Sequence, residues 1–191
     1  MSVHDGFKSY ERFFQAAHQT CNNHLLRRCH EMLETAKGPA LLFPRRVKQI
    51  LQEGLEVRDR RDAGEISAGT AARKAGQLQK QLVQLTEPTK TNAANERFAA
   101  HLFRNQRHVF TYLRTQGIDA TNYRAEQALK MPIVNRKVWG GNRTENGAAA
   151  QGILASVLKT LVLTGRRSIN WLSALLQNPT DTPLLVTLPA G

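Results

Sequence analysis

The expected fold rests on one segment, Asp119-Ala120-Thr121-Asn122-Tyr123-Arg124-Ala125-Glu126-Gln127-Ala128-Leu129-Lys130. Thr121 or Asn122 is a good helix N-cap, and either places Glu126 about one turn into a helix, beside the positive end of its dipole. A carboxylate in that position stays ionised and can face a metal ion. The alternative is a helix-start Glu that pairs with Lys130 at i+4, which is the commoner situation for this spacing.

This segment lies in a strongly basic part of the chain. From Arg97 to Arg143 there are nine Lys or Arg residues and only two acids, Asp119 and Glu126. The whole chain of 191 residues has 27 Lys and Arg against 15 Asp and Glu, a formal charge of +12. This charge makes a polyanion such as DNA the first expected partner. A helical protein with a solvated basic surface is the alternative.

Helical periodicity dominates the rest of the sequence. Four apolar residues at four-residue intervals, Ala149, Ile153, Val157 and Leu161, predict a helix that belongs to the core. Strand signals are scarce, so we expect a mostly α chain with two or three short strands. The expected helices cover residues 7–17, 22–35, 45–61, 70–85, 95–114, 149–162 and 169–176, and the candidate strands are residues 2–4, 18–21 and 132–134.

Two further observations concern the cellular compartment. No segment reaches the roughly 20 apolar residues of a membrane span, and the N-terminus lacks the apolar run of a secretory signal. Two cysteines, Cys21 and Cys29, are too few for a disulfide framework. We therefore expect a cytoplasmic protein that has no membrane partner.

A second acid and several motifs precede the Glu126 segment. Asp5, in His4-Asp5-Gly6, follows a candidate strand, where an Asp before Gly is either a turn residue or a metal ligand. The order of features is His4-Asp5-Gly6, His18-Gln-Thr-Cys21-Asn-Asn-His24, about a hundred helical residues, the Glu126 segment, and Arg136-Lys137-x-x-Gly140-Gly141-Asn142-Arg143. In this order the features resemble bacterial transposases of the insertion sequence 66 family, from Asp5 to about Leu176 and most closely over residues 118–167.

The resemblance implies a fold, an activity and a domain organisation. The fold is the C-terminal portion of an RNase H-like α/β core with a helical insertion. The activity is DNA transposition, in which an Asp, Asp, Glu triad binds two Mg²⁺ or Mn²⁺ ions that promote phosphodiester cleavage and strand transfer. The expected parts are a core remnant at 1–36, the helical insertion at 37–92, a third part at 93–177 with the Glu helix and the C-terminal helices, and a loose tail at 178–191.

The resemblance also assigns residues. Asp5 corresponds to the second metal-binding acid and Glu126 to the third. Cys21, His24 and Asn122 are expected to support the site structurally, and zinc binding by Cys21 and His24 is the less favoured alternative because no second clean pair of ligands lies nearby. DNA phosphate contacts are expected from basic residues, with a solvated basic loop as the alternative: Arg124, Lys130, Arg136, Lys137 and Arg143.

Two departures from the family pattern affect the expected activity. The family usually has Asn where this chain has Tyr123. The first acid of the triad should precede Asp5 by many tens of residues, and only Met1 to His4 do so here. We therefore expect a C-terminal part that is inactive alone, with divalent metal bound only by a complete site. The expected partners are DNA, the missing N-terminal half or other transposition proteins, and further copies of the chain. The alternative is a non-catalytic basic helical protein, derived from a transposase, that binds DNA or another partner.

Overall fold

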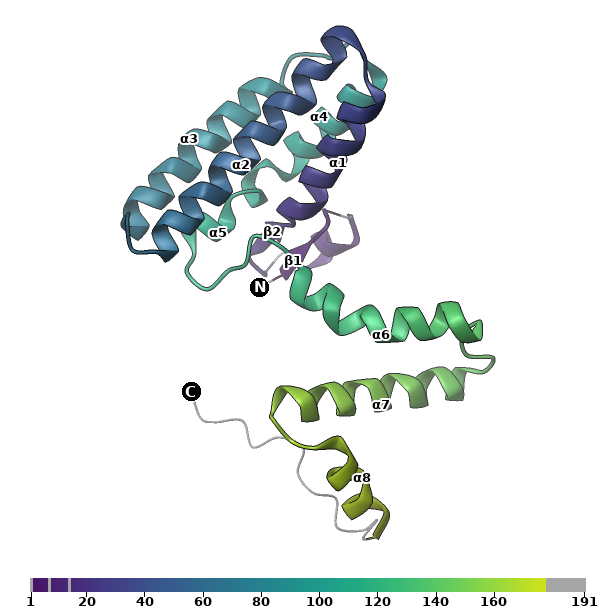
Figure 1. The fold of residues 1–191 in the computed structure, drawn as a ribbon. Coiled ribbons are helices and arrows are strands. Elements are labelled where there is room, and N and C mark those ends of the chain that lie inside the picture. The colour runs from purple at the N-terminus through teal and green to yellow at the C-terminus, as the bar shows by residue number, and fades with distance from the viewer. Residues whose placement is uncertain (1, 7, 14, 178–191) are drawn as a thin grey trace. The chain divides into compact units, whose positions relative to one another are not determined.

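The computed structural model describes residues 2–6, 8–13 and 15–177 (Figure 1). The chain divides into two compact units, with the boundary between Tyr123 and Arg124. Within the described ranges the structure is mostly helical and has two short strands. The mostly α fold class is confirmed. The expected tail, residues 178–191, lies outside the described residues.

The first unit begins with a small parallel sheet. Strands β1 (Ser2–His4) and β2 (His18–Thr20) pair in register, with Val3 opposite Gln19, which confirms the first two candidate strands. The remaining elements are 3-10 helix η1 (Lys8–Arg12), α1 (Asn22–Thr35), 3-10 helix η2 (Gly38–Leu41), α2 (Leu42–Asp62), α3 (Ala68–Thr86), α4 (Ala93–Asn105), 3-10 helix η3 (Gln106–His108) and α5 (Thr111–Arg114).

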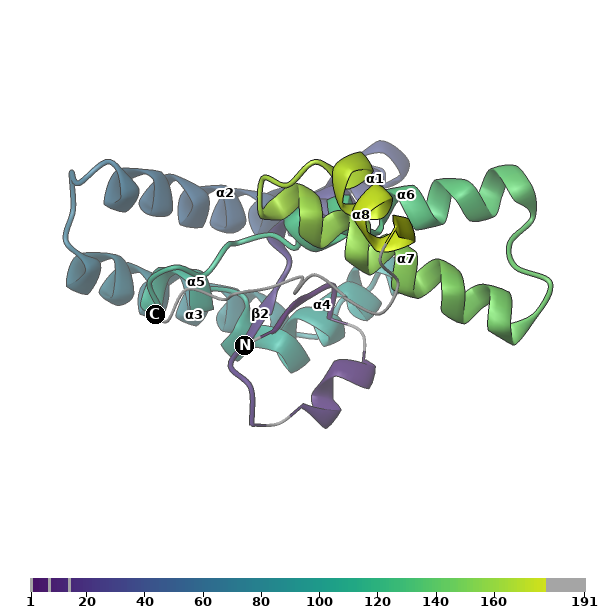
Figure 2. The same cartoon turned by 90° about the horizontal axis from the view of Figure 1, so that it is seen from below.

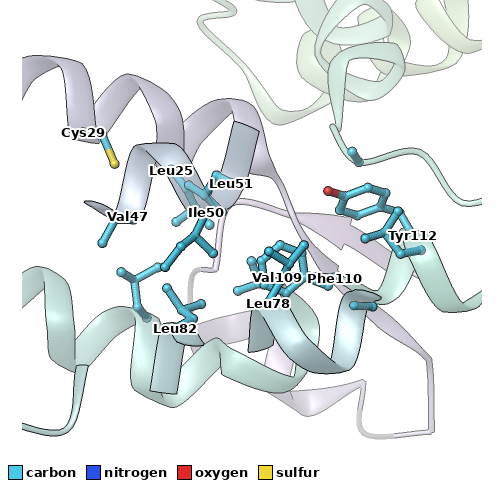
Figure 3. Packing of buried hydrophobic residues seen from close by; sticks show 14 of the residues in the cluster. Leu25, Cys29, Val47, Ile50, Leu51, Leu78, Leu82, Val109, Phe110 and Tyr112 are labelled. Atoms are coloured by element: carbon cyan, nitrogen blue, oxygen red, sulfur yellow. The ribbon is translucent and has the colours of Figure 1, made fainter. Parts of the chain in front are cut away.

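Helices α2 and α3 form the expected pair and share one apolar core with α1, α4 and α5. They lie side by side in both views of the ribbon (Figures 1 and 2). Apolar residues three or four positions apart fall on one face of each helix, and these faces meet in the core (Figure 3). The side chains of Val47 and Ile50 from α2 and of Leu78 and Leu82 from α3 are at most 1% exposed.

The prediction of a single helix over residues 95–114 is wrong. Helix α4 ends at Asn105, whose side chain donates to His101 O (2.9 Å), and η3 separates it from α5. The break has a packing reason. Phe110 and Tyr112 are two positions apart and would point in nearly opposite directions on a straight helix, so they could not both face one core. After the break four apolar residues are at most 1% exposed: Val109, Phe110, Tyr112 and Leu113.

Two shorter expectations also fail. The helix expected over residues 7–17 is present only as the 3-10 turn η1 within the described part of that range. The candidate strand at residues 132–134 lies inside a helix, α6, which includes Pro132. These three residues carried only a weak strand signal, and good helix formers on both sides determine the local structure.

As far as Gln177, the last residue that the structure describes, the second unit is made of three helices. They are α6 (Tyr123–Trp139), which starts at the last residue of the first unit, α7 (Glu145–Leu163) and α8 (Ser168–Gln177). The position of α7 was predicted correctly, but the prediction that it is a core helix was wrong. Only Leu161 is buried, whereas Ile153 and Val162 are each 64% exposed. Periodicity identified the apolar face of α7 without showing whether another helix covers it.

Helix α7 also corrects an expectation about membranes. It has 19 residues, and an 18-residue window within it has a mean hydropathy of 1.2, so the helix is long and apolar enough, by length and composition, to cross a membrane. The expectation that no segment approaches a span is therefore wrong for α7. The core helix of a soluble protein passes the same two criteria, so α7 alone does not assign the chain to a membrane.

Candidate functional site

Asp5 lies at the carboxyl end of the parallel strand pair. It directly follows β1, and Cys21 directly follows β2. The backbone N of Cys21 donates to His4 O (2.7 Å), which continues the pairing to the ends of both strands. The carboxyl ends of parallel strands in α/β sheets commonly form binding sites. The exposed Asp5 side chain is therefore placed where a ligand could reach it.

The turn after Asp5 requires glycine. Gly6 has φ +86°, a conformation that L side chains rarely adopt, and its N donates to His4 Nδ1 (3.0 Å). A Cβ added at Gly6 would lie 2.8 Å from His101 Cε1. The backbone therefore passes directly against an imidazole ring, and this close approach fixes the chain at the Asp5 turn.

Residues 120–122 are hydrogen-bonded to the same end of the sheet. Asn22 N, at the start of α1, donates to Ala120 O (2.9 Å), and Asn122 N donates to the buried Cys21 Sγ (3.4 Å). The thiol of Cys21 thus has a structural contact with Asn122. Asn122 Oδ1 is buried, and no hydrogen bond to it is found among the described residues.

Helix α6 begins directly after Asn122 and has Glu126 in its first turn, as the Glu126 segment predicted. Asp119 stabilises the turn before α6, because its Oδ1 accepts hydrogen bonds from Thr121 N (3.1 Å) and Thr121 Oγ1 (3.3 Å). Glu126 is exposed. Asp5 belongs to the first unit and Glu126 to the second, and the roles of both stay predictions.

A pocket of about 310 Å³ adjoins Asp5 within the first unit. His24, in the first turn of α1, lines it, and so does Arg28, whose guanidinium lies over the Phe98 ring at 4.6 Å. Burial, followed by repulsion from Arg28 and Arg104, lowers the pKa of His101. The pocket therefore places a neutral imidazole and arginine cations beside a carboxylate. Its lining residues are Asp5, His24, Leu25, Arg27, Arg28, Glu31 and His101.

The sequence did not predict a network of histidines beneath this pocket. His4 Nε2 lies 3.0 Å from His18 Nδ1, and His18 Nε2 lies 3.0 Å from Phe13 O. Because His4 Nδ1 accepts from the backbone, its proton is on Nε2, and the bonds are consistent when both rings are neutral. Burial, followed by repulsion from His18, lowers the pKa of His4. The only sequence signal was one histidine in each strand.

A buried glutamine ties β2 to the following helices. Gln19 is 0% exposed; its Nε2 donates to Val109 O (3.0 Å), and its Oε1 accepts from Tyr112 N (3.0 Å). Thr111 Oγ1 donates to His18 O (2.7 Å). A buried amide that satisfies distant backbone groups leaves no periodic signal in the sequence. Gln19 was therefore missed.

The predicted DNA-contacting residues in the second unit are all exposed. Lys130 and Lys137 are four and eleven positions after Glu126, so their helical spacing puts all three on one face of α6. Gly140 (φ +78°) and Gly141 (φ +85°) turn the chain after α6. Of the remaining predicted contacts, Arg136 flanks this face, Arg143 follows the turn, and Arg124, two positions before Glu126, lies on nearly the opposite side of α6.

The residues expected to hold a metal ion do not form a complete set within either unit. In the described ranges no group of three or more His, Cys, Asp or Glu side chains could hold a metal ion. Mg²⁺ is bound mainly through oxygen ligands, with carboxylates as the usual protein ligands. At the strand ends of the first unit Asp5 is the carboxylate that fits this requirement. The donor groups of the first unit therefore do not fit a centre with two metal ions, and no catalytic step follows from them.

A strand-end Asp, a helix-start Glu and an exposed basic helix are all features expected of a DDE-type DNA transposase, whose site also needs a further Asp. The family model described as "Transposase IS66 family" matches residues 1–150, and the chain belongs to that family. The family implies DNA transposition, DNA as a partner and the typical use of a divalent metal ion. Searches of curated proteins and of solved structures found no match to the chain.

Proposed function

We propose that this chain takes part in DNA transposition by holding DNA phosphates and supplying Asp5 and Glu126 as metal-binding carboxylates. Family membership supports the reaction, and the strand-end position of Asp5 supports its role. The ions are Mg²⁺ or Mn²⁺. Cys21, His24 and Asn122 support the site structurally.

One observation carries this proposal. The hydrogen bonds of residues 120–122 to Cys21 and Asn22 hold the start of the Glu126 helix at the sheet end where Asp5 follows β1. About a hundred residues of helix separate these segments in sequence. A fold built only to present a basic surface has no need to fix the segment that precedes α6 at the strand end that carries Asp5.

The same observation supports an RNase H-like arrangement, which we propose as the origin of the sheet. A parallel pair with an Asp after one strand and a helix after the other is a part of such a core. In this proposal residues 1–36 and 93–177 belong to the core and residues 37–92 are a helical insertion. Helices α2 and α3 lie within that insertion.

Two assigned acids, Asp5 and Glu126, limit the DNA cleavage that this chain can catalyse alone. The family pattern assigns no residue among 1–191 to the first acid, and a phosphodiester site with two metal ions needs enough negative charge to hold them together. We propose that the 191-residue chain binds DNA in the cytoplasm without cleaving it. In this proposal cleavage requires a carboxylate in addition to Asp5 and Glu126, and the chain associates with other transposition proteins or with further copies of itself.

The DNA-binding part is tested by the salt dependence of affinity. Arg136→Ala/Lys137→Ala removes two proposed phosphate contacts and should weaken binding to all duplex sequences. The slope of log affinity against log salt should become shallower by about 1.8, from about 0.9 per contact. The matched control is Arg73→Ala/Lys74→Ala, an exposed adjacent pair on α3 with the same charge change. An unchanged slope for the α6 pair would remove it from the DNA-contacting surface.

The exposed basic side chains of α6, which can contact DNA without any role for the acids, favour a second candidate function. It is a non-catalytic DNA-binding or partner-binding protein in which the acids have no role. That candidate predicts DNA binding that responds neither to Mg²⁺ nor to Glu126→Ala. A complete set of acids, restored by a partner, predicts metal-dependent cleavage that Glu126→Gln abolishes.

A further inference from the structure

A basic pocket of about 540 Å³ lies at one end of the first unit, distant in sequence from both acids. It is formed by the connection between α1 and α2, the end of α3, and the connection between α3 and α4. Its walls include the apolar side chains of Leu42 and Phe43 and the cationic side chains of Arg45, Arg46 and Lys90.

The three cations of this pocket are not neutralised by carboxylates. Arg46 donates to two neutral amides, Gln49 Oε1 (3.3 Å) and Gln81 Oε1 (3.4 Å). Lys90 Nζ donates to the carbonyl oxygen of Pro88 and lies 5.3 Å from the centre of the Phe43 ring. In the described part of the chain, no ion pair joins Arg45, Arg46 or Lys90 to an acid. The pocket therefore attracts an anion.

One residue that lines the pocket has a buried hydrogen-bond acceptor that the described residues do not satisfy. Asn95 is 4% exposed and lines the pocket. Its Nδ2 donates to Ala40 O (2.9 Å), which fixes the orientation of the amide, and no donor to Oδ1 is found among the described residues. A buried acceptor without a donor destabilises the fold. A ligand that supplies an N–H to this oxygen would remove that penalty.

These features together define the ligand. The cations favour a phosphate. The apolar wall, which includes the 64% exposed Leu42, favours a flat apolar group. The unsatisfied Asn95 Oδ1 favours a group that donates an N–H. A nucleotide combines all three. In a duplex the donor groups that pair the bases are occupied and the base faces are stacked, so an unpaired nucleotide fits better.

We propose that this pocket binds an unpaired nucleotide of a DNA strand. Arg45 and Lys90 hold its phosphate, the base lies on the exposed side chain of Leu42, and a base N–H donates to Asn95 Oδ1. This inference rests on the proposed role in DNA transposition. It adds a binding site for single-stranded DNA to the DNA contacts proposed on α6.

Fluorescence anisotropy with a labelled short oligodeoxyadenylate, in EDTA so that no metal ion takes part, tests the phosphate contacts. Arg45→Ala/Lys90→Ala should weaken single-strand binding about tenfold, and its salt slope should become shallower by about 1.4, from about 0.7 per contact. The control is Arg73→Ala/Lys74→Ala, which removes the same charge outside the pocket. Equal losses for the two double variants, or an equal loss of duplex binding by the pocket variant, would overturn the proposal.

The base contact is tested separately with Asn95→Leu and an abasic strand of equal length. The variant should bind the adenine strand about fivefold more weakly and the abasic strand as well as the unchanged chain does. Equal effects on both strands would show that Asn95 does not contact a base. Thermal melting confirms that the variant is folded, and the surface variant Arg45→Ala/Lys90→Ala tests the site if it is not. Failure of the unchanged chain to bind any DNA would refute the proposed function as well.

Discussion

Gly54 in α2 is the position where one added methyl group should do the most damage to the core. It is buried, and an added Cβ would lie 2.6 Å from Tyr112 Oη and 2.9 Å from Phe110 Cε1. Ordinary contacts between non-bonded carbon atoms are about 3.5–4.0 Å. Both aromatic side chains are 0% exposed, so neither has free space into which it can move. We expect Gly54→Ala to destabilise the first unit.

The size of the effect follows from two opposing contributions. Overpacking a well-packed core costs about 1–3 kcal/mol, and contacts this short against two buried rings place Gly54→Ala near the upper end. Replacing Gly by Ala inside a helix contributes about 1 kcal/mol in the other direction. The net loss is about 2 kcal/mol, which corresponds to about 8 °C in the melting temperature of a unit of this size.

Gly76→Ala in the adjacent helix α3 is the matched control. Gly76 is exposed, and an added Cβ would meet nothing within 4 Å. The same substitution should therefore raise the melting temperature by about 4 °C. Thermal unfolding followed by circular dichroism measures both variants. A Gly54→Ala variant at least as stable as the unchanged chain would refute the packing described for Phe110 and Tyr112.

Three further predictions concern the strand-end site and a helix cap. Burial is the largest cause of the lowered pKa values of His4, His101 and His108. The free energy of unfolding in urea should therefore be highest above their ordinary pKa near 6.5 and fall as the pH drops below it. A free energy that does not change with pH contradicts this. Gly6→Ala should cost about 1–3 kcal/mol in the same assay, because φ is +86° and the His101 ring is 2.8 Å from the added Cβ. Ser67→Ala should cost about 1 kcal/mol by thermal unfolding, because Ser67 Oγ accepts from Thr70 N at the start of α3; Ser67→Asp should retain the cap.

Local signals in the sequence were sufficient for much of the secondary structure. Residues 2–4 and 18–20 are strands as expected, because short polar-apolar stretches bounded by turn residues leave few alternatives. The helix at 22–35, the end of α2 and the bounds of α3 also follow closely from periodicity and breakers. The start of α2 does not, because Pro44, which indicates a break in the sequence pattern, lies in the first turn of the helix. The position of Glu126 in the first turn of α6 followed from its capping residues.

The predictions that failed concern features that depend on contacts between residues distant in the sequence. The break after Asn105 follows from the need to bury Phe110 and Tyr112 together, and no local motif announces it. The exposure of α7 was hidden because the same apolar stripe is found in a covered and in an uncovered helix. Asn95 looked like an ordinary helix-start residue, and only the fold shows that its amide oxygen is buried in a basic pocket.

Incubating the purified chain with duplex DNA containing insertion-sequence ends, in Mg²⁺ or Mn²⁺, tests most directly whether Asp5 and Glu126 suffice for catalysis. Electrophoresis without denaturant shows binding, and denaturing electrophoresis of the same reaction shows cleavage. We predict DNA that is bound and uncut. Metal-dependent cleavage that is abolished by Glu126→Gln and absent from a mock purification would contradict this prediction.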